Sequence, residues 1–406
     1  MVKEIKIQNY KSVQDLTLEL GRINVLIGAN GCGKSNILEA IAFGSAAADN
    51  KLDKEFLSAR GIRVTDPRAM RSGFNKKSEN KDIEIVFEST FGNNHKLFIE
   101  NDGTPYSQWK VSNTEVFWND NNMPLNEEGE INFNLSNFVK KYFIEKNIDN
   151  QEQIVDDINN LFTKDQKIEA RDYFEKVFSS QLNRNTNLFN FLIFAPENTF
   201  LRKFEDEART IPLGIRGEGL FELLEQMNQE TPEEFQEIIE NLELIDWFDG
   251  FEIPKDLVFT ERRIRIKDRF LGEGLQYFDQ RSSNEGFLFL MFYFALFISK
   301  YTPKFFAIDN IDASLNPKLC IELIKILTKL AKKHDKQVIF TTHNPAVLDG
   351  LNLNDDEVRL LVVSRNRDGH TKMKRILPVE VPEGKVPVRL SEQFMRGYIG
   401  GLPKNF

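Results

Sequence analysis

The segment Gly28–Ser35 reads GANGCGKS, and it stands between the apolar run Ile23–Ile27 and Asn36–Ala42, where apolar residues recur at helical spacing. This order predicts a strand, a glycine-rich loop and a helix. In such a loop, backbone N–H groups converge on phosphate oxygens, and the positive end of the following helix strengthens the attraction. Lys34 is placed to reach the outer phosphates, and Ser35 is placed to offer a hydroxyl to Mg²⁺.

The loop supplies most of the expected nucleotide contacts. A chance glycine turn before a helix is the alternative, but every fixed position of the phosphate-loop pattern is present between a strand and a helix. Cys32 fills a permissive position, and modification of its thiol would block the site. The predicted nucleotide-binding residues are Asn30, Gly31, Cys32, Gly33, Lys34, Ser35 and Asn36.

Composition and charge narrow the class of protein. The 406 residues, 41% of them hydrophobic, suffice for two or three domains. A net charge of −9 gives no overall positive field, so any contact with DNA requires a local basic patch. The 2 cysteines form no disulfide framework and Met1–Lys6 lacks the apolar core of a signal peptide, which predicts a cytoplasmic protein. The longest apolar run, Phe287–Ile298, is shorter than the roughly 20 residues of a membrane-spanning helix, so no membrane contact is expected.

The N-terminal sequence resembles a known family. IKIQNYKSVQDLTLEL at Ile5–Leu20 and INVLIGANGCGKSNILEAIAF at Ile23–Phe43 are similar to the start of the ATP-binding-cassette heads of chromosome-maintenance (SMC) proteins, RecF and the overcoming-lysogenisation-defect nucleases. The resemblance implies an α/β P-loop NTPase that binds ATP with Mg²⁺. Alternating apolar residues from Asp82 to Trp118 predict antiparallel strands that cover the nucleotide side of this head.

The middle of the chain has a different pattern. Apolar residues at spacings of three and four predict a mainly helical insertion over residues 124–188, without the sustained heptads of a coiled-coil arm. The following FAPENTFLRKF, Phe194–Phe204, resembles a segment of RecF, at the place where cassette ATPases have a loop that senses Mg²⁺. Glu197 or Asn198 is the candidate sensor, and a capped loop after a strand explains these residues equally well.

A basic stripe lies in the predicted strand within Leu257–Phe270. Its basic residues alternate with Ile264 and Ile266 and therefore project from one face of the strand. A solvated outer face and a contact with a nucleic-acid backbone both remain open as explanations. The stripe consists of Arg263, Arg265, Lys267 and Arg269.

A second glycine loop, SSNEGFLFLMF at Ser282–Phe292, precedes the predicted Walker B strand at a distance that accommodates a loop, a buried helix and a strand. The resemblance implies a signature loop, which contacts the γ-phosphate bound by the opposite subunit. The chain is therefore expected to form a homodimer or a higher homo-oligomer. The candidate contacts are Ser283, Asn284 and Gly286, although the family pattern has Ser at the position of Asn284. A glycine turn before a core helix is the alternative.

The predicted Walker B strand is Lys304–Asp309, an apolar run that ends in a carboxylate. Asp309 is expected to hold Mg²⁺ together with Ser35. Hydrolytically competent members of the family have Glu at the next position, whereas this chain has Asn310, whose amide cannot accept a proton. Hydrolysis is therefore expected to be slow, with Asp312 as an alternative base at an unfavourable offset.

Another buried strand, Val338–Thr342, ends at His343. A lone histidine in such a place is usually structural, but its position a helix and a strand after Asp309 matches the switch histidine of the family, which contacts the γ-phosphate. His343 and Asn310 are thus the candidate catalytic residues.

Together these patterns predict an α/β ATP-binding-cassette head whose sheet is built from both ends of the chain. The expected divisions are the first half of the head (1–123), the helical insertion (124–188), a strand with a helical lobe (189–256), the second half of the head (257–376) and a tail (377–406).

The resemblance extends to stand-alone ATPases of bacterial phage-defence operons that are related to the lysogenisation-defect family. It implies ATP-dependent dimers that control a separately encoded effector, commonly a nuclease. The residues after His343 contain no acidic cluster for a metal-binding TOPRIM domain. Two alternatives remain, namely a RecF-like DNA-repair ATPase that binds DNA and an ATP-locked scaffold that does not hydrolyse.

Overall fold

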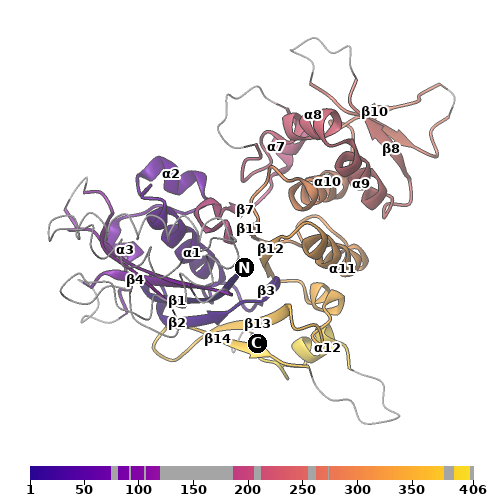
Figure 1. Ribbon diagram of the computed structural model, residues 1–406. Helices are drawn as coiled ribbons and strands as arrows, with labels where there is room; N and C mark the ends of the chain where they lie inside the picture. Colours follow the sequence, from indigo (N-terminus) through magenta and orange to yellow (C-terminus); the bar gives the residue numbers. More distant parts are fainter. Residues whose placement is uncertain are drawn as a thin grey trace, which may run out of the picture.

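The computed structural model describes residues 1–74, 81–90, 93–104, 107–118, 186–204, 212–254, 262–272, 274–378 and 388–402 (Figure 1). Almost all of the predicted helical insertion, 124–188, lies outside these ranges. The described residues form a six-stranded, a five-stranded and a three-stranded sheet, with helices around them.

The six-stranded sheet combines strands from both ends of the chain, as the sequence predicts. Its order is β14, β13, β3, β12, β11, β7. The run from β13 to β7 is parallel, and β14 pairs antiparallel with β13 at one edge. The bounds are β3 (Ile23–Ile27), β7 (Ile193–Phe194), β11 (Phe305–Ile308), β12 (Gln337–Thr342), β13 (Val358–Arg365) and β14 (Thr371–Ile376).

Each face of this sheet has its own hydrophobic core. In β3, Val25 belongs to the core that includes two helices of the C-terminal half, α10 and α11, whereas Leu26 belongs to the core that includes α1. A parallel strand buried on both faces is apolar throughout, because successive side chains point to opposite sides. The helices are α1 (Lys34–Ala48), α10 (Glu285–Ile298) and α11 (Pro317–Lys333).

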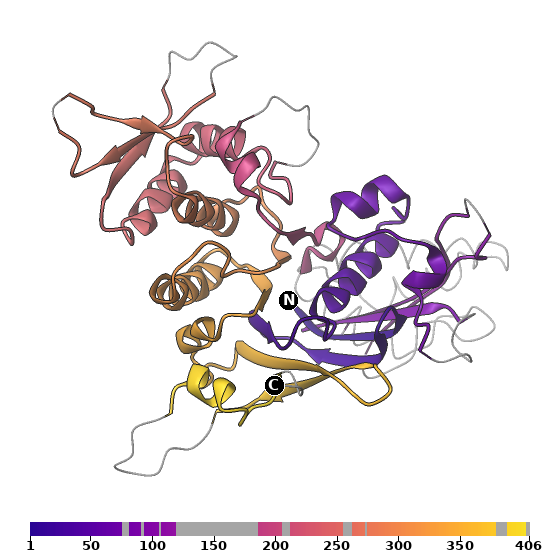
Figure 2. The ribbon, with the colours of Figure 1, turned by 180° about the vertical axis from the view of Figure 1, so that it is seen from behind.

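A five-stranded antiparallel sheet packs on the other side of α1 (Figures 1 and 2). The helix lies close to this sheet at Gly44, where a Cβ would lie 2.8 Å from atoms of Ile85 and Phe87. Three of its strands confirm the antiparallel strands predicted between Asp82 and Trp118. In order along the chain, the strands of this sheet are β1 (Val2–Tyr10), β2 (Val13–Glu19), β4 (Ile83–Ser89), β5 (Asn93–Glu100) and β6 (Lys110–Trp118).

The three-stranded sheet and several helices form a lobe around α10, at the upper right in Figure 1. Every residue from Phe287 to Ile298 in α10 is buried, as expected for a helix that is apolar on all sides. Ile264 and Ile266 are fully buried, which confirms the predicted alternation of the basic stripe. The other members of the lobe are α7 (Asn198–Arg202), α8 (Leu220–Glu230), α9 (Pro232–Leu242), β8 (Phe248–Glu252), β9 (Arg265–Asp268) and β10 (Phe278–Asp279).

Short helices complete the described structure. Helix α12 contacts the 3-10 helix η2 through a hydrogen bond, in which Oγ of Ser391 donates to Oδ2 of Asp349 at 2.7 Å. Within the ranges given above, no helix is long and apolar enough to cross a membrane. The short elements are α2 (Lys54–Ala59), α3 (Pro67–Met70), η1 (Leu188–Asn190), η2 (Pro345–Gly350) and α12 (Leu390–Met395).

Candidate nucleotide-binding site

The phosphate loop connects β3 to α1, as the sequence predicts. Gly31 has φ 72° and Gly33 has φ 110°, values in the left-handed region that favours glycine. Space also restricts Gly33, because a Cβ there would lie 2.1 Å from Oγ1 of Thr371. Larger side chains at Gly33 would therefore deform the loop where it enters the helix.

Hydroxyl and amide groups fix the loop against neighbouring strands. Nδ2 of Asn36 donates to Oγ of Ser12 at 2.7 Å, and this oxygen lies 2.7 Å from Oγ1 of Thr371. Oγ1 of Thr371 in turn donates to the carbonyl oxygen of Cys32 at 3.1 Å. The phosphate loop is thus tied to the β1–β2 turn and to β14, two segments that the sequence analysis did not connect with it.

The side chain of Lys34 lies against the loop backbone. Its Nζ donates to the carbonyl oxygens of Gly28 at 2.8 Å and Ala29 at 3.3 Å. Burial lowers the pKa of Lys34, and the nearby Cys32 and Asp309 oppose that shift. A bound polyanion would give this ammonium charge-assisted hydrogen bonds in place of bonds to neutral carbonyls.

Asp309 and Asn310 follow β11 and share one hydroxyl. Oγ1 of Thr341 donates to Oδ1 of Asp309 and accepts from the backbone N of Asn310 at 2.9 Å. Asn310 has φ 56°, in the left-handed region, which Asn adopts more readily than Glu. The backbone therefore favours an amide side chain at the position where the resemblance implies Glu.

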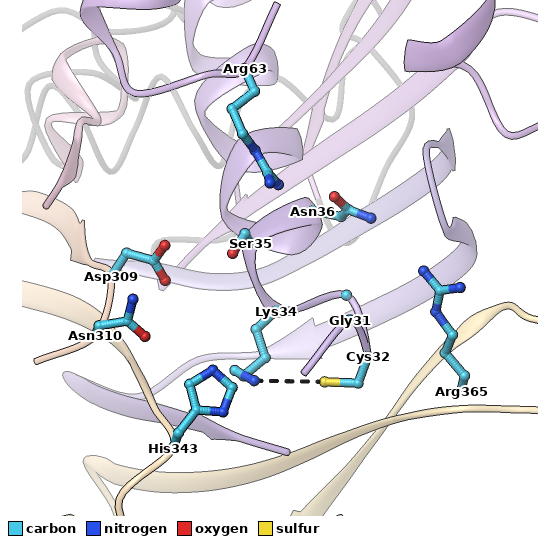
Figure 3. A pocket seen from close by; sticks show the side chains of 11 residues that line it. Gly31, Cys32, Lys34, Ser35, Asn36, Arg63, Asp309, Asn310, His343 and Arg365 are labelled. Carbon is cyan, nitrogen blue, oxygen red and sulfur yellow. Dashed lines mark hydrogen bonds between the residues drawn. The ribbon is translucent and has the colours of Figure 1, made fainter. Parts of the chain in front are cut away.

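These elements surround a pocket of about 300 Å³ (Figure 3). Its lining includes every predicted loop residue from Gly31 to Asn36, together with Asp309, Asn310 and His343. Asn30 is exposed and is not among the lining residues. The structure thus brings together the residues that the separate motifs contributed.

Two arginines that are not among the predicted site residues, Arg63 and Arg365, also line the pocket. Nε of Arg63 donates to Oε1 of Glu39 at 2.5 Å, and the other oxygen of Glu39 pairs with Lys11. Glu39 is buried in α1. A carboxylate on an otherwise apolar helix face requires basic partners. The presence of Glu39 on such a face was therefore the feature of the sequence that could have indicated a basic partner such as Arg63.

His343 follows β12 and is partly exposed, facing Lys34 in the pocket (Figure 3). Partial burial and the charge of Lys34 lower the pKa of His343, while Asp312 and Asp309 oppose this shift. The neutral imidazole is therefore the form expected at pH 7.

The chemistry of the pocket suits a polyphosphate with Mg²⁺. Lys34, Arg63 and Arg365 supply positive charge, and Ser35 and Asp309 offer the oxygen ligands that Mg²⁺ prefers. No group of 3 or more His, Cys, Asp or Glu side chains could hold a metal ion in the part of the chain that the structure describes. The ion would therefore need phosphate oxygens and water to complete its shell.

The segment of the chain that contains these site residues matches a known protein family. The family described as "AAA domain, putative AbiEii toxin, Type IV TA system" matches residues 23–349, a range that includes the phosphate loop, Asp309 and His343. The chain belongs to this AAA ATPase family. Nucleotide binding is the property that membership implies for the pocket.

Two curated proteins match this AAA ATPase over short stretches. The DNA double-strand break repair Rad50 ATPase of Sulfolobus acidocaldarius is 44% identical over 52 residues, which are 13% of this chain and 6% of that protein. The uncharacterised protein MJECL10 of Methanocaldococcus jannaschii is 32% identical over 93 residues, 21% of this chain and 42% of that protein. The match thus spans less than half the length of either relative.

The fold of the AAA ATPase is similar to that of an SMC head. The solved structure of an Smc head bound to the C-winged helix domain of ScpA superposes with a TM-score of 0.53, covering 93% of this chain and 98% of that chain at 15% identity. Such a low identity establishes the fold alone, and it confirms the predicted SMC-type head.

The signature candidates of the AAA ATPase lie away from the pocket. Asn284 caps α10, with its Oδ1 accepting from the backbone N of Phe287 at 2.8 Å. Ser283 is buried, and its Oγ has no hydrogen-bond partner among the described residues. A Cβ on Gly286 would lie 3.2 Å from the carbonyl oxygen of Ser314, in the loop that follows β11. None of the three candidates lines the Lys34 pocket.

The candidate sensor residues and the alternative base are also absent from the pocket lining. Glu197 is exposed, and Oδ1 of Asn198 accepts from Nε of Arg202 at 2.8 Å, a contact within α7. Asp312 accepts from Oγ1 of Thr342 at 2.6 Å. Asn198 and Asp312 therefore have local partners that explain their orientation without a role in the site.

Proposed function

We propose that this AAA ATPase binds ATP with Mg²⁺, dimerises when ATP is bound, and controls a separately encoded effector, commonly a nuclease, in anti-phage defence. This proposal rests on one observation, namely that the residues expected to contact ATP lie in two separate places. Lys34 and Asp309 share one pocket, whereas Gly286 lies beside Ser314 and outside that pocket. A second copy would bring its Gly286 loop to the open side of the pocket and complete the site.

Five of the lining residues have a defined task in this proposal. Lys34, Arg63 and Arg365 neutralise the polyphosphate, with Lys34 nearest to the phosphate loop. Ser35 and Asp309 would hold Mg²⁺, which supplies further charge neutralisation when bound. The hydroxyl of Thr341 orients the Asp309 carboxylate through its hydrogen bond.

Slow turnover follows from Asn310. Its amide lines the pocket and can orient water by hydrogen bonding, but it cannot take a proton from that water. Loss of a positioned base typically costs on the order of 10²–10⁴ in rate. The ATP-bound dimer is then long-lived, and complete loss of hydrolysis would make it the ATP-locked scaffold that the sequence also allows.

Two points favour control of an effector. The family description names a putative toxin and a type IV toxin–antitoxin system together with the AAA domain. A long-lived ATP state also suits a sensor that is closed until a trigger alters it. Both points favour a regulatory ATPase over a motor.

Phage challenge of cells that carry the gene with its neighbours tests this proposal. Protection should be lost with Lys34→Ala and retained with Lys325→Ala, a matched change at an exposed lysine of α11. A neighbouring gene product should show nuclease activity that depends on the parent chain. Full protection by a Lys34→Ala variant that no longer binds ATP would contradict the proposal.

A DNA-repair ATPase is the second candidate, favoured by the match to the Rad50 ATPase. The basic stripe gives it limited support, because Arg265 pairs with Glu252 at 3.4 Å and Arg269 donates to the carbonyl oxygen of Phe248 at 2.7 Å. ATP-dependent binding of duplex DNA at low salt, weakened by replacing Lys267 with Glu, would favour this candidate. Absence of DNA binding at low salt would remove it.

A further inference from the structure

The C-terminal tail, residues 397–402, packs against the base of the phosphate loop. A Cβ on Gly401 would lie 3.6 Å from Cα of Gly28, the first residue of that loop. It would also lie 2.8 Å from Cγ1 of Val362 in β13 and 3.1 Å from Cε2 of Phe394 in α12. Gly401 therefore fills a narrow space between β13, α12 and the phosphate loop, and it brings the two ends of the chain into contact.

Packing and hydrogen bonds fix the tail in this place. Phe394 and Ile399 are buried in the core that includes α10 and α11. The backbone N of Tyr398 donates to the carbonyl oxygen of Gln393 at 2.9 Å, so the tail folds back on α12. Gly401 is therefore anchored to the core through the residues that precede it.

Gly28 is buried and closely surrounded. A Cβ on Gly28 would lie 2.1 Å from the carbonyl oxygen of Val363 in β13 and 3.0 Å from Sγ of Cys32. Close-packed groups transmit a displacement to their neighbours. A change at Gly401 that shifts the tail or β13 would therefore move Gly28.

Gly28 holds two side chains of the nucleotide-binding site. Its carbonyl oxygen accepts from Nζ of Lys34 at 2.8 Å. The ring of His343 also forms a hydrogen bond with the backbone of Gly28. Lys34 and His343 face each other in the pocket (Figure 3). One backbone unit thus contributes to the positions of both side chains that the proposed function places at the phosphates.

We propose that Gly401 is a positioning residue for the ATP site, which acts by supporting Gly28 and, through it, Lys34 and His343. This inference rests on the proposed ATP site and adds a residue from the other end of the chain on which that site depends. Glycine is required at position 401 because its φ of 86° lies in the left-handed region and a side chain has no space. Since coupling between two places in a protein is reciprocal, bound ATP in turn stabilises the tail.

Calorimetry with ATP and Mg²⁺ on the full chain tests this role by two neighbouring substitutions. Gly401→Ala should weaken ATP binding by at least about fivefold, because the added methyl group forces the tail or β13 to shift beside Gly28. Gly400→Ala is the matched control, since Gly400 has a similar φ of 82° and a Cβ there meets nothing within 4 Å. Both variants strain the backbone alike, but Gly400→Ala should bind ATP as the parent does.

Hydrogen exchange of the tail gives a second readout, which a merely structural role of Gly401 would not change. On addition of ATP to the parent, the amide of Tyr398 should exchange more slowly, whereas in Lys34→Ala it should exchange at the nucleotide-free rate. Parent-like ATP affinity of Gly401→Ala, equal losses in the two glycine variants, or tail exchange that ATP does not affect would each overturn the role of Gly401. Failure of the parent to bind ATP would refute the proposed ATP site, and this inference with it.

Discussion

The buried carboxylate of Glu39 accepts a hydrogen bond from Nε of Arg63 at 2.5 Å. The side chain of Glu39 is 2% exposed and that of Arg63 is 66% exposed. Arg63 also lines the nucleotide pocket. The first helix after the phosphate loop therefore positions a cation at the pocket from inside the core.

Substitutions of Arg63 and of Glu39 should have different effects on ATP binding and on stability. Arg63→Ala should weaken ATP binding by about tenfold, the effect of one charge-assisted hydrogen bond, with little change in stability because an ion pair with an exposed partner contributes about 0–1 kcal/mol. Glu39→Gln should weaken ATP binding and also lower the free energy of unfolding by about 3 kcal/mol, since Lys11, 13% exposed, loses its counter-charge. Calorimetry and denaturant unfolding measure the two effects. Parent-like stability of Glu39→Gln would contradict the structural role of the carboxylate.

ATP binding should be coupled to proton uptake at His343. In the free protein, burial and Lys34 lower the pKa of His343, so the ring is neutral above that pKa. In the complex, the phosphate charges raise the pKa of His343. The affinity for ATP should therefore increase as the pH falls from about 7 toward 6, and this gain should be lost as the pH rises again. Calorimetry in two buffers with different ionisation enthalpies measures the uptake, and His343→Gln should abolish it. Equal proton uptake in the parent and in His343→Gln would show that another group titrates.

Asn310→Glu should increase phosphate release by restoring a base, up to the order of 10²–10⁴. The backbone limits this gain, because a φ of 56° at position 310 disfavours Glu. The substitution should therefore lower the free energy of unfolding by about 1 kcal/mol. Asp312→Ala should leave the slow turnover of the parent unchanged, since its carboxylate is bound by Thr342. A steady-state phosphate assay distinguishes these outcomes. Brisk turnover in the parent that disappears with Asp312→Ala would place the base at Asp312.

Much of the site could be predicted from sequence because its residues follow strands. The phosphate loop, Asp309 and His343 each come directly after an apolar strand, namely β3, β11 and β12. These strands are parallel neighbours in one sheet, so their carboxyl ends lie at the same edge. A local pattern of strand and polar end was therefore enough to identify residues that converge in space.

Residues placed by tertiary contacts could not be predicted in this way. Arg63 depends on the buried Glu39, and Arg365 depends on the pairing of β13 with β3. No spacing rule connects these segments with the phosphate loop. Partners of the basic stripe were missed for the same reason, because Glu252 faces Arg265 only through the pairing of β8 with β9.

Molar mass measured by light scattering tests ATP-dependent dimerisation most directly. The parent chain should double its mass on addition of ATP with Mg²⁺, and Lys34→Ala should remain monomeric because it binds no nucleotide. Gly286→Asp should bind ATP and remain monomeric, since its carboxylate would oppose the γ-phosphate of the second copy, whereas Gly272→Asp, a matched change in open space, should dimerise. An unchanged mass of the parent at saturating ATP, or full dimerisation of Gly286→Asp, would contradict the proposed composite site.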